Sequence, residues 1–311
     1  MKTAFLMASP TAEGLIHRAA TQSGPGLRFM EPDRAREATA KLFAALDLAE
    51  GDVGALQSIP AAKLLAGFHA VAALMRAKRF IDLPCFAPVL DPEVLPHHPF
   101  APDAARLTRP IPMILGWNAQ EMSFFMGNDP EGFELDENGL EARMADIFGD
   151  AAAAMLPLYH AAYPDASPSR LWIQAHSDYS VMLPMIAQAE RRVEADSAGT
   201  WLHRFDFQSP ALGGKLGAMH TMEGNLLFNQ PGPGRAVLGD GPEVAELARK
   251  MSSAWVAFAQ SGDPNGGGTE LPIWPAYDLA RRQTMIFEGE CRVEDDPVPE
   301  LRAALAAHLA A

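Results

Sequence analysis

Residues 111–121, Ile-Pro-Met-Ile-Leu-Gly-Trp-Asn-Ala-Gln-Glu, are the stretch that decides the fold. The run from Ile111 to Trp117 is apolar enough for a buried strand, and Pro112 stands near its start, where a missing N–H is tolerated. Three more short runs indicate strands: residues 18–23, 200–207 and 282–287. We therefore expect residues 111–117 to form a central strand, with Glu121 just beyond its carboxyl end.

Helical patterns separate these strands. They cover residues 33–50, 60–79, 137–165, 178–194, 242–260 and an alanine-rich C-terminal stretch. Residues 1–8 indicate a helix already under way, because the apolar run opens without an N-cap residue. Helices that alternate with strands in this way predict an α/β fold with a layered sheet.

Composition narrows the classes of protein. The chain has 311 residues, of which 48% are hydrophobic, and a formal charge of −14. Such a charge repels nucleic acid and anionic membrane surfaces, so we expect neither as a partner. The chain has no apolar run of about 18 residues and no basic leader, which predicts no membrane span and a cytoplasmic location.

Metal and redox sites are not indicated. Cys85 and Cys291 stand far apart and lack Cys-x-x-Cys or Cys/His spacing, so we expect two unpaired thiols. His97-His98 is too short a cluster for a metal site. The glycine-rich run at 263–268 lacks the Lys-Ser/Thr ending of a phosphate loop and the spaced carboxylates of a calcium loop, which favours a surface loop.

Two residues carry candidate chemistry. His220 lies in a loop after a strand, in Gly217-Ala218-Met219-His220-Thr221-Met222-Glu223. By itself it could be an ordinary loop histidine, and Glu121 could be a solvated loop carboxylate. Glu121, however, follows a strand end, where α/β sheets build their sites.

Several blocks of the sequence resemble one family, in family order and over nearly the whole chain. They are LMASPTAEGLIHRAATQSG, FAPVLDPEVLPHHP, PIPMILGWNAQE, HRFDFQSPALGGKLGAMHTMEGNLLF, AWVAFAQSGDPN and WPAYDLARRQTMIF. The chain is similar to type-B carboxylesterases, the group of para-nitrobenzyl esterases and cholinesterases. That resemblance implies a mixed, mostly parallel sheet flanked by helices, as in an α/β-hydrolase. It also implies a carboxylic ester hydrolase that acts on small-molecule esters and needs no cofactor or metal.

The same resemblance implies roles for the two candidates. His220 would be the general base and Glu121 the acid that orients it, in the order Ser, Glu, His expected of α/β-hydrolases. The family's serine lies in a Gly-Glu-Ser-Ala-Gly elbow, and no such elbow precedes Glu121 here. Ser197, in Ala-Asp-Ser-Ala-Gly, has the wrong context, because a predicted helix precedes it and a predicted strand follows.

Further residues match family positions around the pair. Ser23, Asp178 and Glu223 would be supporting hydrogen-bond partners of the acid and the base. The alternatives are a strand-end turn for Ser23, a helix N-cap for Asp178 and a purely structural bond for Glu223. Four aromatic residues could line an acyl or alcohol pocket or belong to the core: Trp117, Phe124, Phe125 and Phe228. Met122 and Gly224 depart from the family pattern, which affects the pocket shape.

The resemblance also predicts the organisation of the chain. Residues 1–311 would be the C-terminal portion of one α/β-hydrolase domain, with helical insertions at about 31–83 and 130–197. We expect a chain that is N-terminally truncated, poorly soluble and inactive by itself. The alternative is a non-enzymatic remnant, or a split half that binds a separate N-terminal polypeptide.

Overall fold

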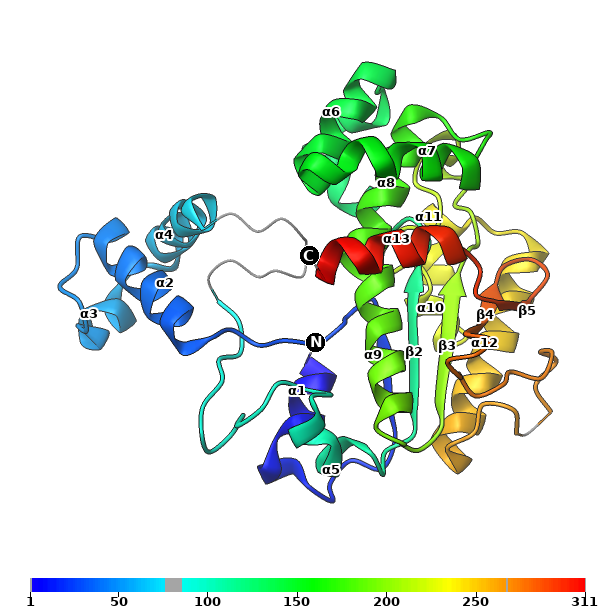
Figure 1. The fold of residues 1–311 in the computed structure, drawn as a ribbon, viewed down its shortest axis with the longest axis horizontal. Coiled ribbons are helices and arrows are strands. Elements are labelled where there is room, and N and C mark those ends of the chain that lie inside the picture. Colours follow the sequence, from blue (N-terminus) through cyan, green and yellow to red (C-terminus); the bar gives the residue numbers. More distant parts are fainter. Residues whose placement is uncertain (1, 76–85, 267, 311) are drawn as a thin grey trace.

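A five-stranded sheet organises the computed structural model, which describes residues 2–75, 86–266 and 268–310 (Figure 1). The strands are neighbours in chain order: β1 (Ala19–Gln22), β2 (Met113–Asn118), β3 (Thr200–Phe205), β4 (Gln283–Phe287) and β5 (Arg292–Asp295). The first four are parallel, and β5 pairs antiparallel with β4. The predicted mixed, mostly parallel sheet and its four predicted strands are confirmed. β5 was not predicted, because three of its four residues are charged.

Helices cover both faces of the sheet. On one face α9 (Leu183–Glu194) contacts β2 and β3, and on the other lie α12 (Pro242–Ser261) and α10 (Gly224–Leu227) (Figure 1). Alternate residues of β2 enter the two cores, since Met113 and Leu115 pack with α9 and Ile114 packs with α12. A parallel strand buried on both faces reads as a continuous apolar run, which explains why residues 111–117 are informative.

The helix that carries α9 begins earlier than predicted. Residues 178–194 belong to a longer helical segment made of α8 (Pro168–Ser177), a π-helical turn (Asp178–Met182) and α9. Ser167 caps the segment, because its Oγ accepts from the Arg170 N–H, and Pro168 opens it. Asp178 therefore lies inside the helix, and the predicted alternative of an N-cap is wrong. The π turn lies just ahead of Pro184, which has no N–H to donate to the preceding turn.

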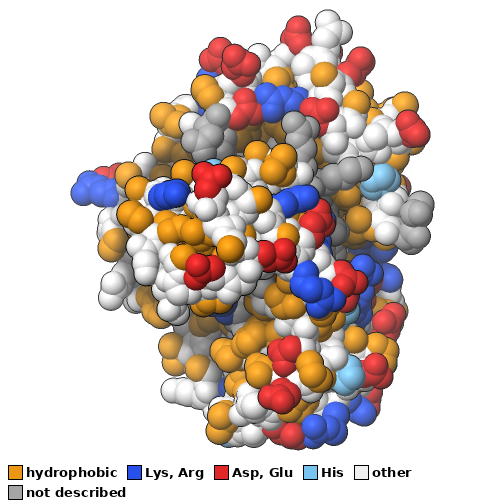
Figure 2. All heavy atoms as spheres, turned by 90° about the vertical axis from the view of Figure 1, so that its left-hand side faces the viewer, with side chains coloured by type: hydrophobic (Ala, Val, Ile, Leu, Met, Phe, Trp, Pro, Cys, Tyr) orange, Lys and Arg blue, Asp and Glu red, His pale blue; other side chains and the backbone are white. Residues whose placement is uncertain are grey.

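A separate lobe contains α2 (Pro32–Ala45), α3 (Val53–Ser58) and α4 (Ala61–Leu74) (Figure 1). It has a small core of its own, formed by Ala38, Leu42, Leu46, Val71 and Met75. The predicted helices at 33–50 and 60–79 are found here, although residues 76–79 lie outside the described residues. Figure 2 looks toward this lobe and shows hydrophobic side chains at its surface between charged ones; Leu64, Leu65 and Leu74 are exposed.

The remaining helices surround these parts. The predicted helix at 137–165 is split into α6 (Glu137–Phe148) and α7 (Ala152–Ala162) at Gly149, whose φ is 55°. The others are α1 (Lys2–Ala8), α5 (Ala105–Thr108), α11 (Arg235–Leu238) and α13 (Pro299–Ala310). Short 3-10 turns lie at Pro10–Ala12, Pro102–Ala104, Glu121–Asn128, Pro130–Phe133, Gly149–Ala151, Ala211–Gly214 and Gly232–Gly234. Within the described ranges, no helix combines the length and the apolar character needed to cross a membrane.

Candidate active site

Glu121 is fully buried one turn beyond the carboxyl end of β2. Its Oε1 accepts hydrogen bonds from the Asn118 N–H, at 2.7 Å, and from the Ser23 hydroxyl. Its Oε2 lies 2.6 Å from Nδ1 of His220. Ser23 reaches the carboxylate because β1 and β2 are parallel neighbours that end at the same edge. Hydrogen bonds to both oxygens hold this carboxylate in one orientation and compensate for the water that it loses on burial.

The loop between β3 and α10 brings His220 to this edge. It turns at Gly217, whose φ is 60°, and a side chain there would overlap the guanidinium of Arg170 and the amide of Gln120. Thr221, next to the histidine, holds φ at 69°, which is costly for a β-branched residue. His220 keeps 21% of its side chain exposed. The loop conformation therefore fixes the backbone around the imidazole and leaves part of the ring at the surface.

Electrostatics favour a histidine that can hold a proton. Burial disfavours the imidazolium, but the hydrogen bond and charge of Glu121, with the charge of Glu223, outweigh it, and the pKa of His220 is raised above its usual value. The carboxylate at Nδ1 selects the tautomer that carries its proton there. Nε2 is then the basic nitrogen, and the imidazolium that forms on protonation is stabilised by Glu121.

Glu223 lies behind the pair. It is buried, and its Oε2 accepts from Nδ2 of Asn118, which also lies 2.5 Å from the Met219 carbonyl oxygen. Burial and the charge of Glu121 raise the pKa of Glu223 to about 7. Asn118 thus connects the end of β2 with the loop of His220 through its side chain and holds Glu121 through its backbone.

The structure brings together four of the predicted site residues: Ser23, Glu121, His220 and Glu223. The rings of Phe124 and Phe125 lie 5.9 and 5.3 Å from the imidazole, measured between ring centroids. Phe228 is 79% exposed, whereas Trp117 is buried in the core on the α9 side of the sheet. Asp178 is buried in the π turn and reaches the loop of His220 only through other side chains.

The remaining candidates lie elsewhere. Ser197 sits between the end of α9 and the start of β3, at the opposite edge of the sheet from His220. His98 bonds to Glu31 and to the Phe29 N–H, and no group of side chains in the described ranges is arranged to hold a metal ion. Cys291 is a free, half-buried thiol, and Cys85 lies outside the described residues.

Sequence reasoning missed three amides of this region: Asn118, Gln120 and Gln174. Asn118 and Gln120 lie within residues 111–121, close to Glu121 in the sequence, so their proximity to the acid could have been predicted. Gln174 bonds to Gln120 from α8, 54 residues further along the chain, and no local pattern marks it.

A buried acid that orients a histidine at the carboxyl edge of a parallel sheet is the arrangement of α/β-hydrolases. The model of the carboxylesterase family matches residues 1–298, and the chain belongs to that family. It is 29% identical over 307 residues to the para-nitrobenzyl esterase of Bacillus subtilis, covering 98% of this chain and 60% of that protein. It is 31% identical over 280 residues to the phenmedipham hydrolase of Pseudarthrobacter oxydans, covering 88% and 54%.

Solved structures agree. A carboxylesterase from Geobacillus stearothermophilus matches with a TM-score of 0.78 and 30% identity, over 97% of this chain and 61% of the other. A para-nitrobenzyl esterase structure matches with a TM-score of 0.73 and 27% identity, over 97% and 59%. The expected α/β-hydrolase fold is thereby confirmed. The chain spans about 60% of the length of these matched esterases.

Proposed function

We propose that this chain supplies the acid and the base of a carboxylic ester hydrolase that works through a Ser-Glu-His acyl-enzyme. The observation that carries the proposal is the Glu121 carboxylate, which is held by Asn118 and Ser23 on one oxygen and lies 2.6 Å from His220 on the other. Membership of the carboxylesterase family supports the same chemistry. The nucleophilic serine and the oxyanion donors would come from a segment outside these 311 residues.

The chemistry follows from the geometry. Nε2 of His220 accepts the proton of the serine hydroxyl while the serine oxygen bonds to the ester carbonyl carbon, and Glu121 stabilises the imidazolium. The tetrahedral intermediate then collapses, the C–O bond to the alcohol breaks, and Nε2 returns the proton to the departing oxygen. Water attacks the acyl-enzyme by the same route and releases the acid. No step requires a cofactor.

The missing segment would pair with β1, on the side of this strand that faces away from β2. The N–H groups of Ala19 and Ser23 bond to carbonyl groups next to and within β2. Because alternate residues of a parallel strand face the same neighbour, the backbone groups of Ala20 and Gln22 face away from β2. Among the described strands, β1 pairs with β2 only. An exposed strand edge is a template for another strand. Continuous polypeptide and a separate N-terminal polypeptide fit this edge equally, and the latter is the second candidate: a split half that becomes active on association.

Two forms of the protein test the proposal. The 311-residue chain alone is expected to hydrolyse p-nitrophenyl acetate only at the background rate. A form that carries a Gly-x-Ser-x-Gly segment ahead of Met1 is expected to turn over, and His220→Ala or Glu121→Gln should lower its kcat by about 10⁴-fold. Ser197→Ala is the matched control and should leave the rate unchanged.

Two results would contradict the proposal. One is turnover in the extended form that does not depend on His220. The other is robust turnover by the chain alone that survives Ser23→Ala and Ser197→Ala but vanishes with His220→Ala, because that result requires a different nucleophile.

A further inference from the structure

Gln120 holds the loop of His220 at two points. Its backbone N–H donates to the Ala218 carbonyl oxygen at 3.0 Å, and its side-chain Oε1 accepts from the Ala218 N–H at 2.8 Å. Ala218 is completely buried and lies two residues before His220. Gln120 also directly precedes Glu121, so one residue connects the turn of the acid with the loop of the base.

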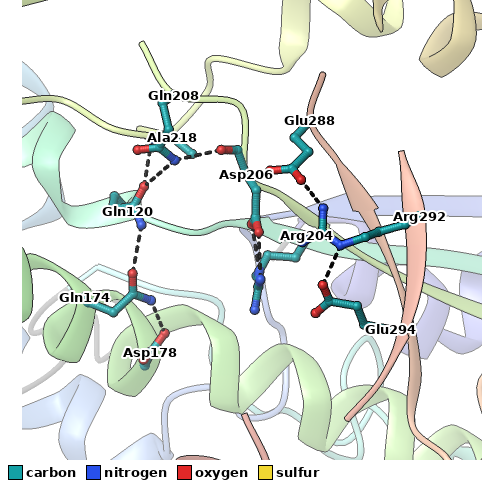
Figure 3. A network of polar contacts seen from close by, with 10 residues as sticks. All are labelled: Gln120, Gln174, Asp178, Arg204, Asp206, Gln208, Ala218, Glu288, Arg292 and Glu294. Atoms are coloured by element: carbon teal, nitrogen blue, oxygen red, sulfur yellow. Dashed lines mark hydrogen bonds and ion pairs between the residues drawn. The ribbon is translucent and has the colours of Figure 1, made fainter. Parts of the chain in front are cut away.

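A chain of side-chain amides continues from Gln120 into α8, as Figure 3 shows. Nε2 of Gln120 donates to Oε1 of Gln174 at 2.8 Å, and Nε2 of Gln174 donates to Oδ1 of Asp178 at 2.8 Å. All three side chains are buried. Oε1 of Gln120 also accepts from Gln208, at 3.2 Å. We name the series Ala218, Gln120, Gln174 and Asp178 the amide relay.

The groups at the two ends of the amide relay determine which way each glutamine amide is oriented, which we call the direction of the relay. The Ala218 N–H can only donate, and an ionised carboxylate at Asp178 can only accept. Between them, each glutamine must present its oxygen toward Ala218 and its nitrogen toward Asp178, since the reverse orientation of either amide would bring two donors or two acceptors together. The alternative orientations are therefore excluded by buried groups that could not be satisfied.

Helix α8 makes a second contact with the turn Gln120–Met122, which contains Glu121. The Ser177 hydroxyl accepts from the Met122 N–H at 3.1 Å while it donates to the Ile173 carbonyl oxygen. Gln174 and Ser177 lie three residues apart and thus on the same face of the helix. This face holds the residues on both sides of Glu121, and through Gln120 it also holds the loop of His220.

We propose that Gln120 is a positioning residue for the His220 imidazole, and that Gln174 and Asp178 fix the direction in which its amide points. The inference rests on the role proposed above for His220 as the base. Gln120 touches neither the ring nor the reacting atoms. It acts through the Ala218 backbone, whose position sets the distance between Nδ1 of His220 and Glu121.

The experiment follows the Nδ1 proton of His220 by NMR in the ¹⁵N-histidine-labelled 311-residue chain, with His220→Ala to assign the signal. Burial raises the pKa of Asp178 to about 7, so spectra are recorded above that pH, where its carboxylate is ionised. Gln120→Leu should speed exchange of the Nδ1 proton with water roughly 10- to 100-fold, because the Ala218 N–H loses its acceptor in a buried site. Gln188→Leu is the matched control, since Gln188 is also buried and accepts from the Gly26 N–H, far from the relay. It should leave the exchange rate unchanged.

A reversal of the relay tests its direction. Gln120→Glu still offers an acceptor to the Ala218 N–H but places a second acceptor opposite Oε1 of Gln174. Gln174 must then turn its oxygen toward Asp178, where two buried acceptors meet, and the side chains have to shift. Exchange should therefore accelerate, although less than in Gln120→Leu. Asp178→Asn alone should have little effect, because its amide oxygen still accepts from Gln174. Combined with Gln120→Glu, it should restore the slow exchange. The new amide at position 178 then donates to Gln174, which donates to the new carboxylate at position 120, and every group is satisfied.

A second double variant tests whether slow exchange is restored by the orientation of the amides or merely by the removal of one negative charge. Gln120→Glu with Glu223→Gln removes a carboxylate nearer to His220 but outside the amide relay. It leaves two acceptors facing each other between Gln174 and Asp178, so it should not restore the slow exchange.

The inference would be overturned by slow exchange in Gln120→Leu, by accelerated exchange in Gln188→Leu, or by a failure of Asp178→Asn to restore slow exchange in Gln120→Glu. Restoration by Glu223→Gln would also overturn it, because charge rather than direction would then be the cause. Ester hydrolysis is measured separately. A relay that behaves as expected, in a protein whose serine-bearing form hydrolyses no ester, would refute the proposed function and leave the positioning of His220 established.

Discussion

His203 is expected to make the folded chain sensitive to acid. It lies in the middle of β3, fully buried, with its ring centroid 5.2 Å from that of Trp255 and 5.4 Å from that of Phe287. In the described part of the chain, neither ring nitrogen has a hydrogen-bond partner. Burial lowers the pKa of His203 to about 3. The substitution that removes the titration and keeps an aromatic ring is His203→Phe.

The sign and size follow from linkage. A histidine in the unfolded chain has a pKa of about 6.5, so between about pH 6.5 and 3 the unfolded state binds a proton that the folded state does not. The stability that neutral His203 allows is present above pH 6.5 and is lost as the pH falls toward 3. At pH 4.5 the loss is about two pKa units, or about 2.7 kcal/mol. Phenylalanine binds no proton, so the variant escapes this loss.

The assay is urea unfolding followed by circular dichroism at pH 7.0 and pH 4.5. The difference in unfolding free energy between His203→Phe and the parent chain should grow by about 2.7 kcal/mol in favour of the variant as the pH falls. Any steric effect of the larger ring against Gly116 is common to both pH values and cancels. His17→Phe, at an exposed histidine, is the control and should show no such growth. Parallel pH curves for His203→Phe and the parent would refute the reasoning.

Three more predictions concern buried groups. Between pH 4.5 and pH 8, Glu223→Gln should gain up to about 3 kcal/mol of stability relative to the parent chain. The folded pKa of Glu223 is raised to about 7, so this carboxyl stabilises the fold below pH 4.5 and ceases to do so as the pH rises through 7. Urea unfolding of both proteins at the two pH values checks this, and a difference in unfolding free energy that does not change with pH would contradict it. Gly217→Ala should cost about 2–4 kcal/mol, because it adds overlap with Arg170 to the penalty of a positive φ. Gly14→Ala shares the positive φ without neighbours within 4 Å, and an equal cost there would contradict the steric explanation. Arg192→Met should cost about 3 kcal/mol in urea unfolding, because buried carbonyl groups of Thr108, Ile111 and Ala198 lose a donor; Arg191→Met should cost far less.

Much of the fold could be predicted because its strands are locally distinctive. The run at 111–117 is apolar on both faces, as a central parallel strand requires, and the helix at 242–260 carries a proline at its start and Gly262, with φ at 85°, at its end. β5 escaped prediction because Arg292, Glu294 and Asp295 give it no apolar face. The start of α8 was missed although Ser167-Pro168 is a usual opening for a helix.

The site was predictable only in part, for a different reason. Glu121 and His220 stand in distinctive loops, and the family resemblance gave them roles before the structure showed their side chains in contact. The amides that hold them carry no signature, since glutamine is common on exposed helix surfaces and becomes informative only when its burial is known. Asp178 was expected near the base, and the structure places it two glutamine side chains away from the Ala218 backbone.

The helical segment from Pro168 to Glu194 is held by hydrogen bonds at both ends of the parallel strands. Near one end Gln174 and Ser177 bond to the turn of Glu121, and near the other Arg192 donates to carbonyl groups of Ile111 and Ala198, which flank the starts of β2 and β3. The roughly eighteen residues between Gln174 and Arg192 span about 27 Å of helix. The segment therefore keeps these two sets of contacts at a fixed separation. Loss of the Arg192 hydrogen bonds is expected to displace Gln174, and with it the loop of His220, although Arg192 itself does not contact that loop.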